Sequence, residues 1–161
     1  MTPDEWMREL RALHQAARAG KLDDAQKKIY TEACEQLARS MVAAQRLNVD
    51  PGLPARRVFH VTQGLQVDLD LLGGRQRCMT QDLSCGGFAV TLKEAPGPKE
   101  LPGYTLRLPG GAEPLVGRVK VAAVVARPGS ARVSFAFENM SEKQTATLES
   151  ALFDIVLSRV P

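Results

Sequence analysis

The sequence predicts a mainly β fold with helices: about six antiparallel strands that form a small barrel or sandwich, followed by a C-terminal helix and preceded by an N-terminal α-helical hairpin. Three observations carry this prediction. Apolar residues recur every three or four positions along the first third of the chain, which is the helical period. Apolar and polar residues alternate in short runs over residues 66–137, and glycine or proline separates the runs. A capping box and a last helical stripe follow at residues 141–157.

The first two elements are predicted to be antiparallel helices. Thr2 and Glu5 have the spacing of a capping box, and Gly20 is a suitable helix stop. A second helix fits residues 23–47, after which a segment rich in proline and glycine forms a linker. The predicted domains are a helical hairpin at residues 1–50, a linker at 51–55, and the barrel with its C-terminal helix at 56–161.

The second helix carries an apolar stripe formed by Tyr30, Cys34, Leu37, Met41 and Ala44. A stripe of this length needs cover, because an exposed apolar surface is an aggregation liability. In the first reading it packs on the rest of the same chain, as amphipathic helices usually do. In the second reading Tyr30, Leu37 and Met41 form a surface for a protein partner or for a second copy of the chain.

The remaining elements are predicted to be strands. A strand over residues 66–71 is followed by a turn at 72–75 and a return strand over 76–82. Further strands are expected at 88–92, 104–108, 115–126 and 131–137. The long strand has a possible bend at Gly117, and Ser141 with Gln144 caps the final helix.

Composition excludes several classes of protein. Hydrophobic residues make up 44% of the 161 residues and charged residues 24%, which is ordinary for a globular domain. The net charge of +3 arises entirely after Ala55 and is too small to coat nucleic acid. The apolar run at 119–126 is too short to span a membrane, and Met1–Trp6 lacks the pattern of a signal peptide. We therefore expect a cytoplasmic protein.

The sequence offers no catalytic or metal-binding pattern. Two histidines and three cysteines exclude most zinc sites and a disulfide framework. No glycine-rich phosphate loop is present, and no pattern supplies a base for Ser84 or Cys85. We therefore expect a protein that is not an enzyme and has neither a metal nor a cofactor.

One segment, Gln81–Phe88, has the chemistry of a binding site. Asp82 and Ser84 project on the same face of an extended chain, and the two glycines that follow allow a sharp bend. A carboxylate suits the hydrogen-bond donors on the edge of guanine. The alternative is a turn in which Asp82 and Ser84 bond their own backbone.

These residues resemble the PilZ domain family. That family carries an RxxxR motif, followed about one hairpin later by a [D/N]xSxxG motif. The second motif is complete here in Asp82, Ser84 and Gly87, and residues 55–61 correspond to the first. The later order of strands is also similar, and the likeness covers about residues 54–157.

The resemblance implies a six-stranded barrel with a C-terminal helix and the bacterial second messenger cyclic di-GMP as the ligand. PilZ proteins are receptors or adaptors that control motility, pili, polysaccharide export and virulence. In those that bind the nucleotide, the motif arginines grip phosphate and stack on guanine. The implied ligand-binding residues are Arg56, Arg57, His60, Asp82, Ser84 and Gly87.

The first motif departs from the family pattern. If Arg57 is the first arginine, Val61 stands at the second position; if Arg56 is the first, His60 stands there. Valine cannot contact phosphate, and histidine is mostly neutral at pH 7. The loss of one charge-assisted contact costs about 1.5–3 kcal/mol, or roughly 10- to 100-fold in affinity. Arg75 and Arg77 either compensate or are ordinary solvated charges.

Three functions follow. The preferred one is a PilZ-type adaptor that acts through protein contacts on a motility or surface-polysaccharide system, with nucleotide binding weakened or lost and with a possible homodimer through the N-terminal helices. The first alternative is a fully competent cyclic di-GMP receptor. The second is a barrel that binds single-stranded nucleic acid, which the low aromatic content of 5% disfavours.

Overall fold

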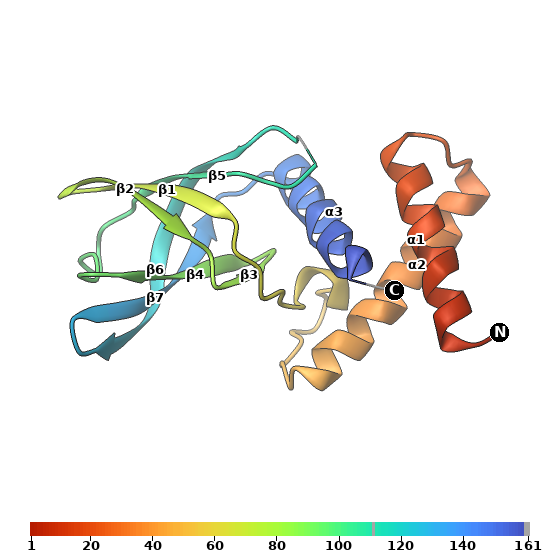
Figure 1. The fold of residues 1–161 in the computed structure, drawn as a ribbon, viewed down its shortest axis with the longest axis horizontal. Coiled ribbons are helices and arrows are strands. Elements are labelled where there is room, and N and C mark those ends of the chain that lie inside the picture. Colours follow the sequence, from red (N-terminus) through yellow and green to blue (C-terminus); the bar gives the residue numbers. More distant parts are fainter. Residues whose placement is uncertain (111, 160–161) are drawn as a thin grey trace. The chain divides into compact units, whose positions relative to one another are not determined.

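The computed structural model describes residues 1–110 and 112–159. Its elements, in chain order, are α1 (Pro3–Arg18), α2 (Asp24–Ala44), η1 (Ala55–Arg57), β1 (Gln66–Leu71), β2 (Gly74–Met79), β3 (Asp82–Ser84), β4 (Gly87–Leu92), β5 (Gly103–Leu106), β6 (Leu115–Arg127), β7 (Ser130–Glu138) and α3 (Glu142–Ser158) (Figure 1). The chain divides into two compact units. We call residues 60–148 the sheet unit, and residues 1–59 with the segment from Glu149 onward the helical unit.

The sheet unit is one antiparallel sheet with the strand order β2-β1-β5-β6-β7-β4-β3. Its two outermost strands, β2 and β3, are consecutive in the chain and are separated by only Thr80 and Gln81. The sheet therefore curls until its two edges are joined by the chain itself (Figure 1). This confirms the predicted antiparallel fold, with seven strands in place of six.

The additional strand comes from residues 76–82, which were expected to form a single strand. Thr80 still pairs with the segment before β1, because its backbone N–H donates to the Leu65 carbonyl at 2.9 Å. Gln81 has already changed partner, since its N–H donates to the Ala89 carbonyl on β4 at 2.8 Å. The chain crosses here from one edge of the sheet to the other, so one predicted strand becomes β2 and β3.

The long strand β6 is irregular at a different place from the one expected. Its register with β7 shifts between Val121 and Ala123, which is a β-bulge. At Gly117 the strand remains paired with Tyr104 of β5. A Cβ at Gly117 would lie 3.2 Å from the Tyr104 ring, so this glycine makes room for an aromatic side chain.

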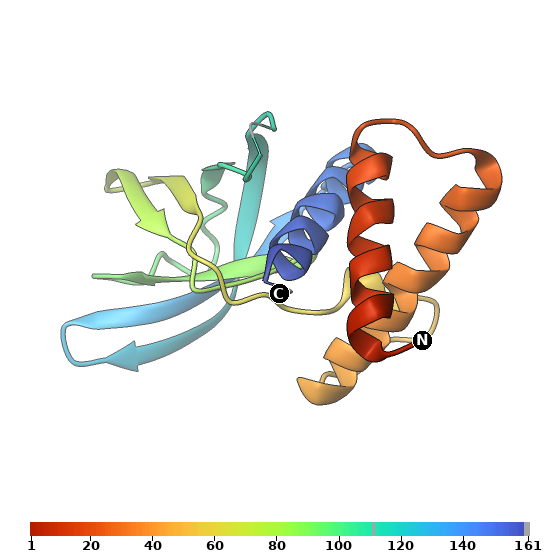
Figure 2. The same ribbon diagram turned by 45° about the vertical axis from the view of Figure 1, so that its right-hand side comes forward.

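In the helical unit, capping boxes start both N-terminal helices, and the one at the first helix was predicted. Thr2 and Glu5 cap α1, and Asp23 and Gln26 cap α2. Figure 2 shows α1 and α2 as an antiparallel pair, which confirms the predicted hairpin. In the sheet unit, Ser141 and Gln144 make the reciprocal bonds that begin α3.

The buried face of α2 is rotated from the predicted stripe. The fully buried positions are Cys34, Ala38 and Val42, spaced four residues apart. Leu37 and Met41 are half-buried, and Ala44 at the end of the predicted stripe is exposed. Of the predicted stripe, Cys34 is therefore buried, Leu37 and Met41 lie beside the buried positions, and Ala44 does not pack.

Candidate functional site

The second motif is built on two paired strands of the sheet unit. Asp82 lies opposite Ala89, and Ser84 lies opposite Gly87, in the β3–β4 pair. Alternate residues of a strand share a face, so Asp82 and Ser84 lie on one side of the sheet. The neighbouring positions on that side are all small: Gly87 and Ala89 on β4, and Ser134 and Ala136 on β7. The side chains that surround the motif on this side of the sheet are therefore all short.

Gly87 is required by the backbone rather than by a ligand. A Cβ there would lie 1.8 Å from the Phe135 carbonyl oxygen, a distance that no side chain can occupy. Gly87 pairs with Ala136 in the β4–β7 ladder, and its lack of a side chain lets these strands meet. The last glycine of the motif thus has a structural cause that holds with or without nucleotide.

His60 and Asp82 form a close pair. The distance from His60 Nδ1 to Asp82 Oδ2 is 2.7 Å, and the side chains are 39% and 29% exposed. The hydrogen bond from His60 is the largest influence on Asp82 and holds the pKa of its carboxyl group below the usual value; the nearby charge of Arg132 acts in the same direction. Asp82 is therefore ionised at neutral pH, and its carboxylate already has a partner.

Ser84 follows the alternative considered from the sequence. Its hydroxyl accepts a hydrogen bond from the Gly86 backbone N–H at 3.1 Å, which closes a serine turn. The hydroxyl keeps its own hydrogen for donation. Asp82 differs, because its side chain pairs with His60 rather than only with its own turn.

The two arginines of the first motif lie in the helical unit. Arg56 and Arg57 belong to η1, and the Nε atoms of both lie within hydrogen-bond distance of Glu149 Oε1, at 3.2 Å and 2.9 Å. The boundary between the units falls between Phe59 and His60. The predicted site residues therefore form two groups: the arginines with Glu149, and His60 with Asp82.

Of the two possible alignments of the first motif, the structure favours the one that uses His60. Val61 is only 3% exposed, and its backbone forms a bridge with Leu83 on β3. A side chain at position 61 points into the sheet unit's interior. His60 is partly exposed and touches the second motif directly. The relevant spacing is thus Arg56 to His60.

Arg75 and Arg77 form ion pairs away from the two motifs. Both lie on β2 and pair with the buried carboxylate of Asp68 on β1, at 3.4 Å and 3.1 Å. The hydrogen bond from Arg77, then that from Arg75, lowers the pKa of Asp68 despite its burial. These arginines therefore neutralise a carboxylate of the sheet.

Sequence reasoning missed three residues near the motifs. Arg132 and Ser134 lie beside the second motif on β7, and their two-residue spacing on a predicted strand could have placed them on one face. Glu149 binds the arginines, but it is far from them in sequence and no motif marks it. Only the tertiary structure shows this contact.

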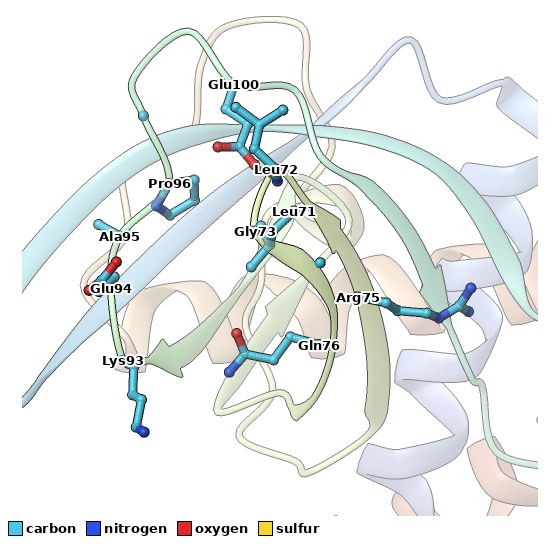
Figure 3. A pocket seen from close by; sticks show the side chains of 12 residues that line it. Leu71, Leu72, Gly73, Arg75, Gln76, Lys93, Glu94, Ala95, Pro96 and Glu100 are labelled. Atoms are coloured by element: carbon cyan, nitrogen blue, oxygen red, sulfur yellow. Dashed lines mark hydrogen bonds between the residues drawn. The ribbon is translucent and has the colours of Figure 1, made fainter.

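Two cavities of the sheet unit lie at other elements. Their volumes are about 540 Å³ and about 700 Å³, and they are lined by the β1–β2 turn and the loop of residues 93–102. Figure 3 shows the first, with Leu72, Pro96 and Glu100 around it. Neither lining includes a residue of the two motifs.

Three further properties bear on function. Cys34, Cys78 and Cys85 are buried and form no disulfide with one another. Across residues 1–110 and 112–159, no cluster of His, Cys, Asp and Glu side chains has the geometry to hold a metal ion. In the same residues, no helix combines the length and hydropathy needed to cross a membrane.

Solved structures with a similar fold include three bacterial proteins. The inhibitor of motility MotI/DgrA from Bacillus subtilis matches with a TM-score of 0.54 at 16% identity over 63% of this chain and 51% of its own. YcgR from Escherichia coli, solved in complex with c-di-GMP, matches with 0.53 at 19% over 62% and 45%. MrkH from K. pneumonia matches with 0.52 at 16% over 63% and 49%. The chain thus spans about half the length of each.

No curated protein matches the chain. The model of the PilZ domain, however, matches residues 55–154. This range begins at the arginine segment, contains the complete Asp82–Gly87 motif and runs into the final helix. Motif, strand order and family match agree, and the chain belongs to the PilZ domain family.

Proposed function

We propose that this protein is a signalling adaptor of the cyclic di-GMP network that acts through protein contacts, and that its own affinity for the nucleotide is weakened or lost. The observation that carries the proposal is the pair formed by His60 and Asp82 at 2.7 Å. His60 stands where the family motif has its second arginine, and it occupies the carboxylate that would otherwise receive guanine.

The exchange of arginine for histidine changes the chemistry of the site. A guanidinium group is always charged and presents several donors in one plane, which suits bidentate contact with phosphate. The His60 ring has only two nitrogens, and one of them already faces Asp82. The missing charge-assisted contact lowers affinity by roughly 10- to 100-fold.

Each unit retains polar residues that the family motifs imply for the nucleotide. Arg56 and Arg57 supply cations that suit phosphate, and Asp82 and Ser84 supply polar atoms that suit a base. No catalytic step, metal or cofactor is required by this role, because the nucleotide acts only as a ligand. The buried thiols fit the reducing cytoplasm.

The output of such an adaptor depends on a partner surface. We propose that the exposed side of α2, flanked by the half-buried Tyr30, Leu37 and Met41, binds a component of a motility or surface-polysaccharide system. The same surface could instead pair two copies of the chain. Light scattering on the wild type separates a monomeric adaptor from a homodimer.

Calorimetric titration with cyclic di-GMP tests the nucleotide half of the proposal. We expect weak or undetectable binding by the wild type, and further loss in Arg57→Ala and Asp82→Ala if heat is detected. Tight binding by the wild type would support the competent receptor instead. Tight binding that survives Arg56→Ala would show that the alignment of Arg56 and His60 with the motif is incorrect.

A further inference from the structure

The arginine segment is held by a second carboxylate besides Glu149. Glu35 on α2 accepts hydrogen bonds from the backbone N–H groups of Ala55 and Arg56, at 3.0 Å and 3.2 Å. Its side chain is 15% exposed. Glu35 therefore fixes the backbone of η1, while Glu149 on α3 holds the guanidinium groups. We call Glu35 and Glu149 together the carboxylate clamp.

Within the clamp, Glu149 offsets the charge that a phosphate would seek on Arg56 and Arg57. Glu149 lies against the Nε atoms of both Arg56 and Arg57, whereas Glu35 is also paired with Arg39 at 3.4 Å. The Glu149 and Arg57 side chains are each 18% exposed, and Arg56 is 30% exposed, so these ion pairs are partly shielded from water. Ion pairs in such surroundings are screened less by solvent and salt than surface pairs. A ligand must therefore displace a carboxylate that already meets the same donors.

The ion pairs are nevertheless within reach of a ligand. Arg56 and Glu149 line a cavity of about 250 Å³ in the helical unit, together with Arg18, Tyr30 and Cys34 among others. A phosphate oxygen could enter here and compete for Arg56 without unfolding of the unit. The Nε atoms now facing Glu149 are donors that suit phosphate equally well.

We infer that Glu149 is a determinant of nucleotide affinity: its carboxylate competes with the phosphates of cyclic di-GMP for Arg56 and Arg57. This rests on the proposed function, since it assumes that these arginines face the nucleotide when it binds. The effect is separate from that of His60, which acts on Asp82. Two features thus lower the affinity for cyclic di-GMP: His60 stands in place of an arginine, and Glu149 already binds Arg56 and Arg57.

The decisive variant is Glu149→Gln, which keeps a hydrogen-bond acceptor and removes the charge. Calorimetric titration with cyclic di-GMP should show about tenfold tighter binding than in the wild type, the scale of one charge-assisted contact. The gain should vanish in Glu149→Gln combined with Arg56→Ala and Arg57→Ala. Glu32→Gln is the matched control, because Glu32 is exposed on the same unit's α2, and it should leave affinity unchanged.

A second readout needs no nucleotide. Phenylglyoxal modifies guanidinium groups, and mass spectrometry of the peptide that contains Arg56 and Arg57 follows the rate. Modification should be several-fold faster in Glu149→Gln than in the wild type and in Glu32→Gln. Circular dichroism checks that each variant is folded. If Glu149→Gln unfolds, Glu149→Asp replaces it in both measurements, because the shorter aspartate side chain cannot keep the same contacts with the arginines.

The outcomes separate this inference from the proposed function. Equal or weaker nucleotide binding by folded Glu149→Gln would overturn the inference, since it would mean that Glu149 is neutral or positions the arginines. If neither the wild type nor Glu149→Gln binds cyclic di-GMP, the inference about Glu149 is also overturned. The proposal of an adaptor that does not bind the nucleotide would then stand. Tight binding by the wild type would overturn the proposed loss of affinity, and the ratio between variant and wild type would still decide the role of Glu149.

Discussion

The two units of the molecule are stabilised in different ways. The sheet unit is stabilised by backbone hydrogen bonds between its strands and by an aromatic cluster. In this cluster the ring centroid of Phe88 lies 5.6–6.1 Å from those of Tyr104, Phe135 and Phe137. The helical unit has an apolar core of its own, in which the ring centroids of Phe59 and Phe153 lie 4.9 Å apart. It adds polar contacts between its helices, such as Arg18 with Asp154 at 3.0 Å and His14 with the Tyr30 hydroxyl at 2.6 Å. In paired strands the backbone hydrogen bonds decide which side chains face the core, whereas a helix can rotate about its own axis unless side-chain contacts hold it. Point substitutions and pH should therefore affect the two units differently.

The largest expected effect tests which face of α2 is its core. Ala38→Asp with Val42→Asp places two carboxylates at positions that are 0% and 5% exposed. We expect the helical unit to unfold, with a loss of about 4 kcal/mol or more, because buried charges without partners are very costly. The measurement is urea denaturation followed by circular dichroism.

The matched variant is Leu37→Asp with Met41→Asp, which changes the flanking, half-buried positions. It should keep the fold and lose the partner contact or the dimer, as measured by light scattering. If this variant unfolds while the Ala38 and Val42 pair is tolerated, the assigned core face of α2 is incorrect.

The next effect belongs to the sheet unit and depends on backbone spacing. Gly87→Ala must separate β4 from β7, because its Cβ would overlap the Phe135 carbonyl. We expect a loss of about 3 kcal/mol in the free energy of unfolding. Gly86→Ala is the control, since a Cβ there would meet only the Ser84 hydroxyl at an ordinary 3.6 Å. Equal stability of the two variants would contradict the close approach of the strands.

This contrast also explains what could be predicted from sequence. The strand at residues 66–71 was predicted with its observed bounds, and the capping boxes at Thr2 and Ser141 were found at their residues. The strand shows in the sequence as an alternation of polar and apolar residues, and each capping box depends only on residues three positions apart. The division of residues 76–82 into β2 and β3 was not predictable, because it depends on which strand Gln81 pairs with.

The exact positions that α2 buries were not predictable for a related reason. Large apolar residues mark a face in most amphipathic helices, but Ala38 and Val42 here allow close packing and Leu37 and Met41 lie beside them. Similarly, the Asp82 and Ser84 motif is local and was visible in the sequence. Glu149, which binds the arginines, comes from a distant helix and carries no motif.

A moderate effect on affinity is expected from repair of the first motif. His60→Arg restores a guanidinium at a side chain that is 39% exposed, and we expect roughly tenfold tighter binding of cyclic di-GMP in calorimetry. Val61→Arg is the contrasting change, since position 61 is buried and the arginine should destabilise the sheet unit without a gain. No gain from a folded His60→Arg protein would show that the lost arginine is not what limits binding.

The smallest effect is a difference in pH response between the units. Burial lowers the pKa of His14 below its usual 6.5, although Asp154 partly opposes this. The unfolded chain therefore binds a proton that folded His14 does not, and the helical unit should lose stability as the pH falls below about 6.5. In the sheet unit, Asp68 and Asp82 have pKa values below 3.8, so their stabilising effect is complete above that pH and is lost only as the pH falls further. Hydrogen exchange, corrected for its intrinsic rate, should show faster opening of α1 and α2 at pH 5.5 than at pH 7.5, with little change in β4 and β7. His14→Phe should remove this response; its persistence in that variant would assign the pH sensitivity to another group.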